Sequence, residues 1–464
     1  MKKVELIFVP SPGVGHLASA VEAAKLLLHT DDRISITVFV FKRSSDSNFT
    51  AYSYNLTTTP RLRFFNLPMV ESQTFNLDYM EPQTPQVRQA VSNLFSTSGS
   101  PPAGFVLDMF CTPMMDVARE FGVPSYIYFA SNAAFLGFLF HVQLLRDEHQ
   151  IDLAQAKDPE AELTLPTFTK PYPARVLPSV VLQKEFLSSV LNHTRRYREA
   201  KGILVNSFTE LESHVLDSLS QGNNPPVYPV GPILNLGSDE NNSRKKEIMD
   251  WLDDQPSSSV VFLCFGSKGA LSEEQVKEIA CALDHSKHRF LWSLRRPPPK
   301  EQTMIAYPAE YENLEEVLPV GFLDRTVGVG KIIGWAPQTA ILGHPAIGGF
   351  VSHCGWNSTL ESLWFGVPIA AWPLRAEQQL NAFELVKELE LAAEIKMDYR
   401  KEDGIIVKAE EIERGIRCVM EQDSKIRKNA REISEKSKMV LMEGGSSISA
   451  LNRFIEDVMD NVSK

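Results

Sequence analysis

The sequence predicts an α/β protein built from two doubly wound parallel sheets. Short strand-like runs alternate with helical stretches from one end of the chain to the other. The apolar residues in these runs are continuous rather than alternating, which is typical of strands covered on both faces. A polar segment, residues 235–246, separates one βα series from the next and is expected to be a solvated linker.

The first βα series occupies the N-terminal half of the chain. A strand over 4–9 leads into a helix over about 16–29. The segment 44–60 is rich in Ser, Thr and Asn and is expected to be a surface loop. Further strands are predicted at 34–41, 62–67, 104–107, 125–129 and 203–206.

The second βα series begins with a strand over 260–265. Ser272 is predicted to cap the helix that follows, because Gln275 stands three residues further on. A second surface loop is expected over 295–318, and its basic residues Arg295 and Arg296 are interpreted as part of a solvated face. Later strands are predicted at 290–293, 331–334, 348–352 and 369–372.

Composition limits the classes of function. The 464 residues suffice for two or three domains, and 43% hydrophobic with 23% charged residues excludes a disordered, collagen-like or coiled-coil chain. The net charge of −11 disfavours general binding to nucleic acid or anionic membranes. The five cysteines are scattered, and neither a targeting segment nor a membrane span is found. A cytoplasmic protein is therefore expected.

The loop after the first strand carries Gly13, Gly15 and His16. Glycines there allow a tight turn, and the helix end offers unpaired N–H groups. One interpretation is a dinucleotide site, which Lys42 and Arg43 would adapt to a 2′-phosphate. Another is that His16 points into the crevice above the sheet as a base, and a third is that it is a helix-end histidine without a role.

Asp108 follows the predicted strand 104–107, at the edge where side chains of open α/β sheets emerge. Its carboxylate could hold the N–H group of the His16 imidazole. Alternatively, Asp108 caps the next helix.

A denser group of motifs lies in the C-terminal half. The turn His353-Cys354-Gly355 follows a predicted strand, and Asn357 and Ser358 begin the next helix. The unpaired N–H groups of this helix end form a possible cradle for a diphosphate. Ser267, after the strand 260–265, could reach the same phosphates.

Three further residues of this region are candidates for contact with a ligand. Trp335 offers a flat face on which a base could stack. Glu361 could bind ribose hydroxyls, or it could form a capping box with Ser358. Trp356 could contact a ligand or pack in the core.

The stretch from Trp335 to Gln378, 44 residues long, resembles the signature box of the plant family 1 UDP-glycosyltransferases. The Pro-Gly-x-Gly-His loop, Asp108 and the sequence Phe-Gly-Ser at 265–267 extend this resemblance over essentially the whole chain. It implies the GT-B fold, in which two Rossmann-like domains face each other across the active-site cleft. The implied ranges are an acceptor domain over 1–232, to which the helix 446–464 packs back, a linker over 233–250 and a UDP-sugar domain over 251–445.

The resemblance also implies roles for single residues. His16 is implied to be the general base and Asp108 the residue that orients it. UDP is implied to contact Ser267, Trp335, Ala336, Gln338, His353, Gly355, Asn357, Ser358 and Glu361, and the sugar Trp356, Glu377 and Gln378.

Acceptor recognition is harder to predict. Gly15 is a candidate contact, and Phe110, Phe138 and Phe186 could line the acceptor pocket or belong to the core. Arg375 stands where many relatives carry an aromatic residue, and its guanidinium could contact the acceptor, an acidic sugar or nothing.

The expected reaction is inverting transfer of glucose from UDP-glucose to a hydroxyl of a small lipophilic acceptor, such as a flavonoid, chalcone, other phenolic or terpenoid. No D-x-D motif occurs, so a metal-independent enzyme without cofactor is expected, with the helix end at Asn357 stabilising the leaving diphosphate. A monomer is expected. Two alternatives are an NADP-dependent oxidoreductase and a non-catalytic nucleotide-sugar sensor.

Overall fold

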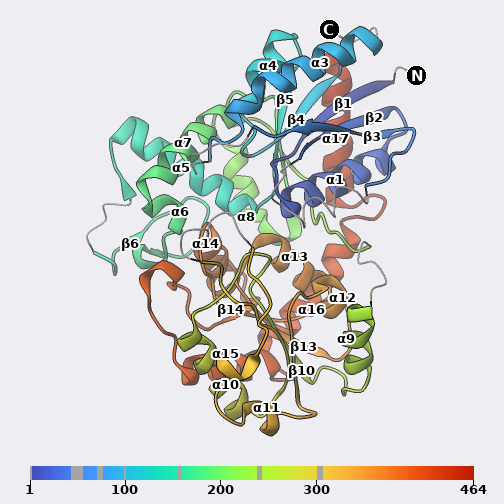
Figure 1. Cartoon of the computed structure of the whole chain (residues 1–464). Coiled ribbons are helices and arrows are strands. Elements are labelled where there is room, and N and C mark those ends of the chain that lie inside the picture. Colours follow the sequence, from blue (N-terminus) through green and yellow to red (C-terminus); the bar gives the residue numbers. More distant parts are fainter. Residues whose placement is uncertain are drawn as a thin grey trace. The chain divides into compact units, whose positions relative to one another are not determined.

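The computed structural model describes residues 3–42, 56–70, 77–98, 101–153, 158–237, 243–299 and 307–463. The chain divides into two compact units (Figure 1). The first unit contains Met1–Gln155, Gln183–Asn235 and Met439–Lys464, and the second contains Ala156–Leu182 and Leu236–Lys438. Residues 156–182 thus group with the second unit, whereas the range 1–232 implied for the acceptor domain includes them.

The first unit is built on a seven-stranded sheet in the order β3-β2-β1-β4-β5-β8-β9. All its neighbouring strands are parallel, as the continuous apolar runs predict. The carboxyl ends of β1 and β4 are adjacent, because Val9 pairs with Leu107. The strands are β1 Val4–Val9, β2 Ile34–Lys42, β3 Leu62–Pro68, β4 Gly104–Asp108, β5 Ser125–Phe129, β8 Ile203–Val205 and β9 Val227–Pro229.

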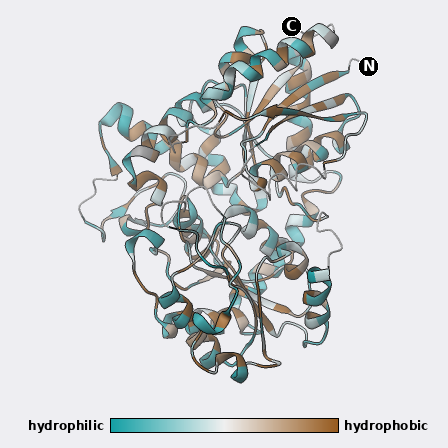
Figure 2. Ribbon diagram, viewed as in Figure 1, coloured by the Kyte–Doolittle hydropathy of each residue, from teal (hydrophilic) through white to brown (hydrophobic). Residues whose placement is uncertain are grey.

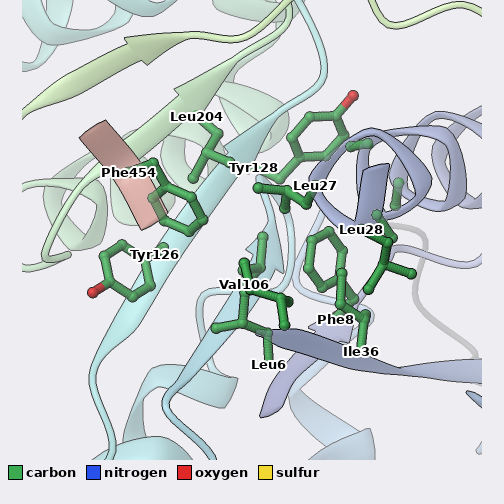
Figure 3. Packing of buried hydrophobic residues seen from close by; sticks show 14 of the residues in the cluster. Leu6, Phe8, Leu27, Leu28, Ile36, Val106, Tyr126, Tyr128, Leu204 and Phe454 are labelled. Carbon is green, nitrogen blue, oxygen red and sulfur yellow. The ribbon is translucent and has the colours of Figure 1, made fainter. Parts of the chain in front are cut away.

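The last helix of the chain, α17 (Ser446–Ser463), completes the core of the first unit. It packs on β9 and on α1, and in Figure 1 the red helix lies beside the blue strands. Phe454 is fully buried and meets Tyr126 edge-on, at a centroid distance of 5.0 Å (Figure 3). Its ring also meets that of Tyr228 edge-on, at 5.5 Å. The other main helices are α1 Val14–Thr30, α3 Thr84–Ser98, α4 Met114–Glu120, α5 Ala133–His149, α7 Lys184–Tyr197 and α8 Thr209–Ser220.

The second unit is built on a six-stranded parallel sheet in the order β12-β11-β10-β13-β14-β15. The side chain of Ser272 accepts a hydrogen bond from the N–H group of Gln275, so the predicted cap of α10 (Glu273–Ser286) is confirmed. The strands are β10 Val260–Cys264, β11 Arg289–Ser293, β12 Gly330–Ile333, β13 Ile347–Ser352, β14 Ile369–Ala371 and β15 Ala392–Glu394. Other helices are α9 Ser243–Asp253, α11 Phe322–Arg325, α12 Gln338–Leu342, α13 Trp356–Trp364, α14 Gln378–Phe383, α15 Ala409–Met420 and α16 Lys425–Met439.

Residues 156–182 are bound to the second unit by several contacts. The guanidinium of Arg400 donates to the carbonyl oxygens of Arg175 and Leu177, at 2.7 and 2.6 Å. The N–H and hydroxyl groups of Ser179 lie 3.3 Å from the side-chain oxygen of Gln379. The segment contains the short hairpin of β6 (Glu162–Leu163) and β7 (Tyr172–Pro173) and the helix α6 (Ser179–Leu182).

The hydropathy of the residues differs between strands and helices. Hydrophobic colours gather on the strands, and the helices carry both kinds of residue (Figure 2). In the part of the chain that the structure describes, no helix combines the length and apolarity needed to cross a bilayer. Of the predicted surface loop 44–60, residues 44–55 lie outside the described residues.

Candidate functional site

His16 lies in the first turn of α1, directly beside Asp108 at the end of β4. Gly13, with φ of 151°, adopts a backbone conformation open to glycine and so lets the chain turn from β1 into the helix. The Nδ1 atom of His16 lies 2.8 Å from Oδ2 of Asp108. Because an ionised carboxylate can only accept, Nδ1 donates, and in the neutral ring Nε2 is the basic nitrogen. The His16 side chain is 34% exposed, whereas that of Asp108 is fully buried.

Three donors hold the carboxylate of Asp108. Besides His16, the hydroxyl of Ser11 donates to Oδ1 at 2.5 Å and the N–H group of Phe110 donates to Oδ1 at 3.1 Å. Burial alone would raise the pKa of Asp108, but the neighbouring His16 and these hydrogen bonds bring that pKa below its usual value. The next helix, α4, begins with Pro113 as its N-cap, so Asp108 does not cap it.

The ring of Phe110 stands beside the imidazole of His16, with centroids 5.7 Å apart in an edge-on arrangement. Tyr79 lies on another side of Phe110, at 6.4 Å. Phe110 is therefore placed where it could contact a molecule bound at His16. Phe138 is fully buried in α5, as the core alternative anticipates, and Phe186 is partly buried on α7. A side chain at Gly15 would meet no atom within 4 Å.

In the second unit, His353 lies at the end of β13, between two glycines. A Cβ atom at Gly266 would come within 2.4 Å of its Nε2 atom, and one at Gly355 within 2.5 Å. Both positions therefore require glycine for the imidazole to fit. Burial, helped by the positive charges of Arg375 and Arg295, lowers the pKa of His353 to about 3, so the ring is neutral at ordinary pH.

The helix α13 begins immediately after this turn, with Gly355 as its N-cap. Gln338 donates from one amide nitrogen to Ser358 Oγ at 2.8 Å and to Glu361 Oε2 at 2.7 Å. Ser358 is inside the helix rather than at its N-cap position, so the capping-box alternative for Glu361 is wrong. The Oδ1 atom of Asn357 is buried and has no hydrogen-bond partner among the described residues. An additional donor could bind there.

Trp335 follows β12 and is 52% exposed, so one face of its indole is available to a planar group. Ala336, next to it, is buried. Trp356 is only 3% exposed at the start of α13, which fits the core alternative for most of its side chain.

One expectation about the loop 295–318 is wrong. Arg295, interpreted as part of a solvated face, is only 6% exposed, whereas Arg296 is exposed. The reason is that the guanidinium of Arg295 finds carbonyl partners in the loop after β10, at Gly266, Ser267 and Gly269. Ser267 itself is exposed.

The turn between β14 and α14 holds Arg375 and Glu377, and Gln378 is the first residue of α14. The side-chain oxygen of Gln378 accepts from the N–H groups of Leu374 and Arg375, at 2.9 and 3.0 Å. Because the oxygen is used in this way, the amide nitrogen points elsewhere and can donate to a ligand. Glu377 is the N-cap residue of α14 and is partly exposed. Burial lowers the pKa of Arg375, against the raising influence of Glu402 and Glu377.

The structure thus gathers the predicted residues into two groups, one in each unit. Ser11, Tyr79 and Arg295 belong to these groups and were missed. Ser11 lies two residues before Gly13, and nothing in the sequence singles it out from other serines. No set of three or more His, Cys, Asp or Glu side chains within the described ranges is placed to hold a metal ion.

Comparison with known proteins agrees with this arrangement. Residues 205–435 match the family model described as UDP-glucoronosyl and UDP-glucosyl transferase. UDP-glycosyltransferase 71A15 of Malus domestica is 56% identical over 98% of this chain and 100% of its own length. UDP-glucose flavonoid 3-O-glucosyltransferase 6 of Fragaria ananassa is 54% identical over 99% of each chain.

Solved structures give the same result. A transferase from Siraitia grosvenorii in complex with UDP has a TM-score of 0.89 and 50% identity, over 98% of this chain and 100% of the other. UGT71G1 of Medicago truncatula, complexed with UDP-glucose, has a TM-score of 0.88 and 39% identity, over 98% of both chains.

Two Rossmann-like units with these neighbours define a glycosyltransferase of the GT-B fold. The chain belongs to the plant family 1 UDP-glycosyltransferases, and its donor is a UDP-sugar. The oxidoreductase alternative is therefore not supported.

Proposed function

We propose that this enzyme transfers glucose from UDP-glucose to a hydroxyl group of a small lipophilic acceptor and inverts the anomeric configuration. The observation that carries the proposal is the buried Asp108 carboxylate hydrogen-bonded to the partly exposed His16 at 2.8 Å. A flavonoid or related phenolic is the proposed acceptor class, since relatives 54% identical to this chain are named as flavonoid 3-O-glucosyltransferases.

The proposed reaction begins with proton removal by His16. The acceptor hydroxyl gives its proton to Nε2 while its oxygen attacks the anomeric carbon of the sugar. The bond from that carbon to the diphosphate oxygen breaks, and its electron pair leaves with UDP, so UDP-α-glucose gives a β-glucoside. A positioned base contributes typically about 10²–10⁴ in rate. Asp108 stabilises the imidazolium that forms.

The leaving diphosphate is proposed to be stabilised without a metal ion. The N-terminus of α13 has no side-chain cap among the described residues, and the N–H groups of a helix's first turn carry a partial positive charge. His353 is held neutral beside it and can donate one hydrogen bond. Trp335 is proposed to stack on uracil, and Gln338 and Glu361 to bind the edge of the base and the ribose.

The sugar is proposed to contact Glu377 and the amide nitrogen of Gln378, with Trp356 beside it. We further propose that the enzyme acts as a monomer in the cytoplasm, where its five free cysteines would stay reduced. Light scattering of the purified protein and fractionation of expressing cells would test these two points.

The proposal is tested by incubating the enzyme with UDP-glucose and a panel of flavonoids, simple phenols and terpenoid alcohols, read by mass spectrometry. We expect a mass gain of one hexosyl group, a product with the β configuration by proton NMR, and full activity in excess chelator. His16→Ala should abolish transfer while UDP binding persists. Transfer by that variant at the wild-type rate, an α product, or a strict metal requirement would each contradict a part of the proposal. UDP-glucose binding without transfer to any acceptor would instead favour the sensor.

A further inference from the structure

The buried guanidinium of Arg295 gathers the carbonyl groups of one short loop. Its Nη1 atom donates to the carbonyl oxygen of Ser267 at 2.9 Å, and its Nη2 atom donates to those of Gly266 and Gly269, the latter at 3.2 Å. Gly266 has φ of 74°, a left-handed conformation that glycine adopts freely. Three carbonyl groups of four successive residues thus converge on a single cation.

The direction of these carbonyl groups fixes the direction of the neighbouring N–H groups. In a trans peptide, the carbonyl of one residue and the N–H of the next point in opposite directions. The N–H groups of Ser267, Lys268 and Ala270 therefore point away from the guanidinium. A run of backbone N–H groups turned to one side is an anion-binding arrangement. Within the described residues, the N–H group of Ser267 donates no hydrogen bond, so it can donate to a bound anion.

The same guanidinium also reaches the other parts of the donor site. Its central carbon lies 5.8 Å from the ring centroid of Trp335. Gly266, which it binds, packs directly against the imidazole of His353. Arg295 therefore contacts the loop proposed for the diphosphate and the ring proposed for uracil at once.

We infer that Arg295 is a positioning residue that shapes the loop 266–270 into a binding site for the donor diphosphate and ties that site to Trp335. The inference rests on the proposed function, because it takes the ligand to be a UDP-sugar. Arg295 contributes through the loop that it holds and need not contact the ligand.

The geometry requires arginine rather than another cation. Burying a positive charge is costly unless its donors are used, and here two nitrogens of the planar fork serve three acceptors. The third nitrogen, Nε, is buried without a partner among the described residues. Lysine would keep the charge, but it presents a single nitrogen and cannot span the three carbonyl groups in the same way.

The test compares the affinities of UDP and uridine, measured by calorimetry on the full-length chain. Uridine shares the base and ribose with UDP but lacks the diphosphate, so the ratio of the two affinities reports on the loop. For Arg295→Lys and Arg295→Gln we expect UDP affinity to fall roughly 10–100-fold, the range found when a residue that orients metal ligands is replaced. Uridine affinity should change about threefold or less. Arg296→Gln, which removes the neighbouring exposed charge, should leave both affinities unchanged.

Three results would overturn the inference. Equal losses for UDP and uridine would show a general disturbance of the unit. Wild-type UDP affinity in Arg295→Lys would show that charge alone matters. Failure of both variants to fold, judged by circular dichroism, would assign Arg295 to core stability instead. A wild-type enzyme that binds UDP more tightly than uridine, yet transfers no sugar to any acceptor, would refute the proposed function and leave this inference standing.

Discussion

Replacing Asp108 with asparagine should disable the proposed base while leaving its surroundings in place. The backbone N–H group of Phe110 is a fixed donor to Oδ1 of Asp108. In the variant only the amide oxygen can accept that hydrogen bond, so the amide NH₂ group must face Nδ1 of His16. The imidazole then carries its proton on Nε2, where it cannot accept a proton from the acceptor hydroxyl.

The expected loss follows from charge and tautomer together. The pKa of Asp108 lies below its usual value, so the substitution removes a full negative charge 2.8 Å from His16. At an effective dielectric constant of about 20, two unit charges about 4 Å apart interact by about 4 kcal/mol, which corresponds to roughly 10³ in rate. The same Asp→Asn change in a serine protease triad, which removes the charge and changes the tautomer together, costs about 10⁴. We therefore expect kcat to fall by about 10³–10⁴.

The assay is the initial rate of glucoside formation from UDP-glucose and a simple phenol. Asp116→Asn, on α4 in an exposed ion pair with Arg196, is the matched control and should keep wild-type activity. An acceptor that is already ionised at the assay pH, such as a nitrophenol, should lose far less activity, because it needs no base. A variant within tenfold of wild type on the simple phenol would refute the reasoning.

Three further outcomes are expected. Ser11→Ala removes a donor to Asp108, so the carboxylate holds the His16 imidazolium more strongly and the base stays protonated to higher pH. The acid limb of the pH–rate profile should therefore move to higher pH while the plateau rate is retained, and an unmoved limb would count against the role of Ser11. The pKa of His353 is lowered to about 3 from the ordinary 6.5, so the folded state resists protonation that the unfolded state accepts. The free energy of unfolding should therefore drop as pH falls below 6.5, by up to about 1.4 kcal/mol per pH unit, and His353→Gln should flatten that slope in urea titrations between pH 4 and 7. Phe454→Ala should destabilise the first unit by about 3–5 kcal/mol in urea denaturation while UDP affinity stays unchanged, and a loss under 1 kcal/mol would mean that α17 is not part of that core.

The strands of both sheets could be predicted where burial on both faces leaves a continuous apolar run, as in β1 and β10. β9 and β15 were missed because their residues do not indicate a strand: β9 is Val-Tyr-Pro and ends in proline, and β15 is Ala-Ala-Glu, which has low β propensity. The His16–Asp108 pair was predictable because each residue stands at the end of an element whose place in a parallel sheet is general. The distance between His16 and Asp108 and the hydrogen bond from Ser11 to Asp108 depend on side-chain packing, which the sequence does not show.

Other features depend on partners far along the chain. A buried arginine cannot be told from a solvated one until its acceptors are known, and those of Arg295 lie 26 to 29 residues earlier. Residues 156–182 show no strong periodicity, and they group with the second unit because Arg400 and Gln379, about 200 residues later, bind them. Local sequence carries no signal for either contact.

The division of the chain also bears on its synthesis. Asn461, at the end of α17, donates to the hydroxyl of Tyr126, which is made 335 residues earlier. At about 5–20 residues per second, the ribosome needs roughly 17–67 s to add those residues. During that time the apolar surface that Phe454 later covers lies open. The second unit can close once Arg400 and the residues up to Lys438 have been made, whereas the first unit must wait for α17. We therefore expect the nascent first unit to depend on shielding by chaperones until α17 has been made.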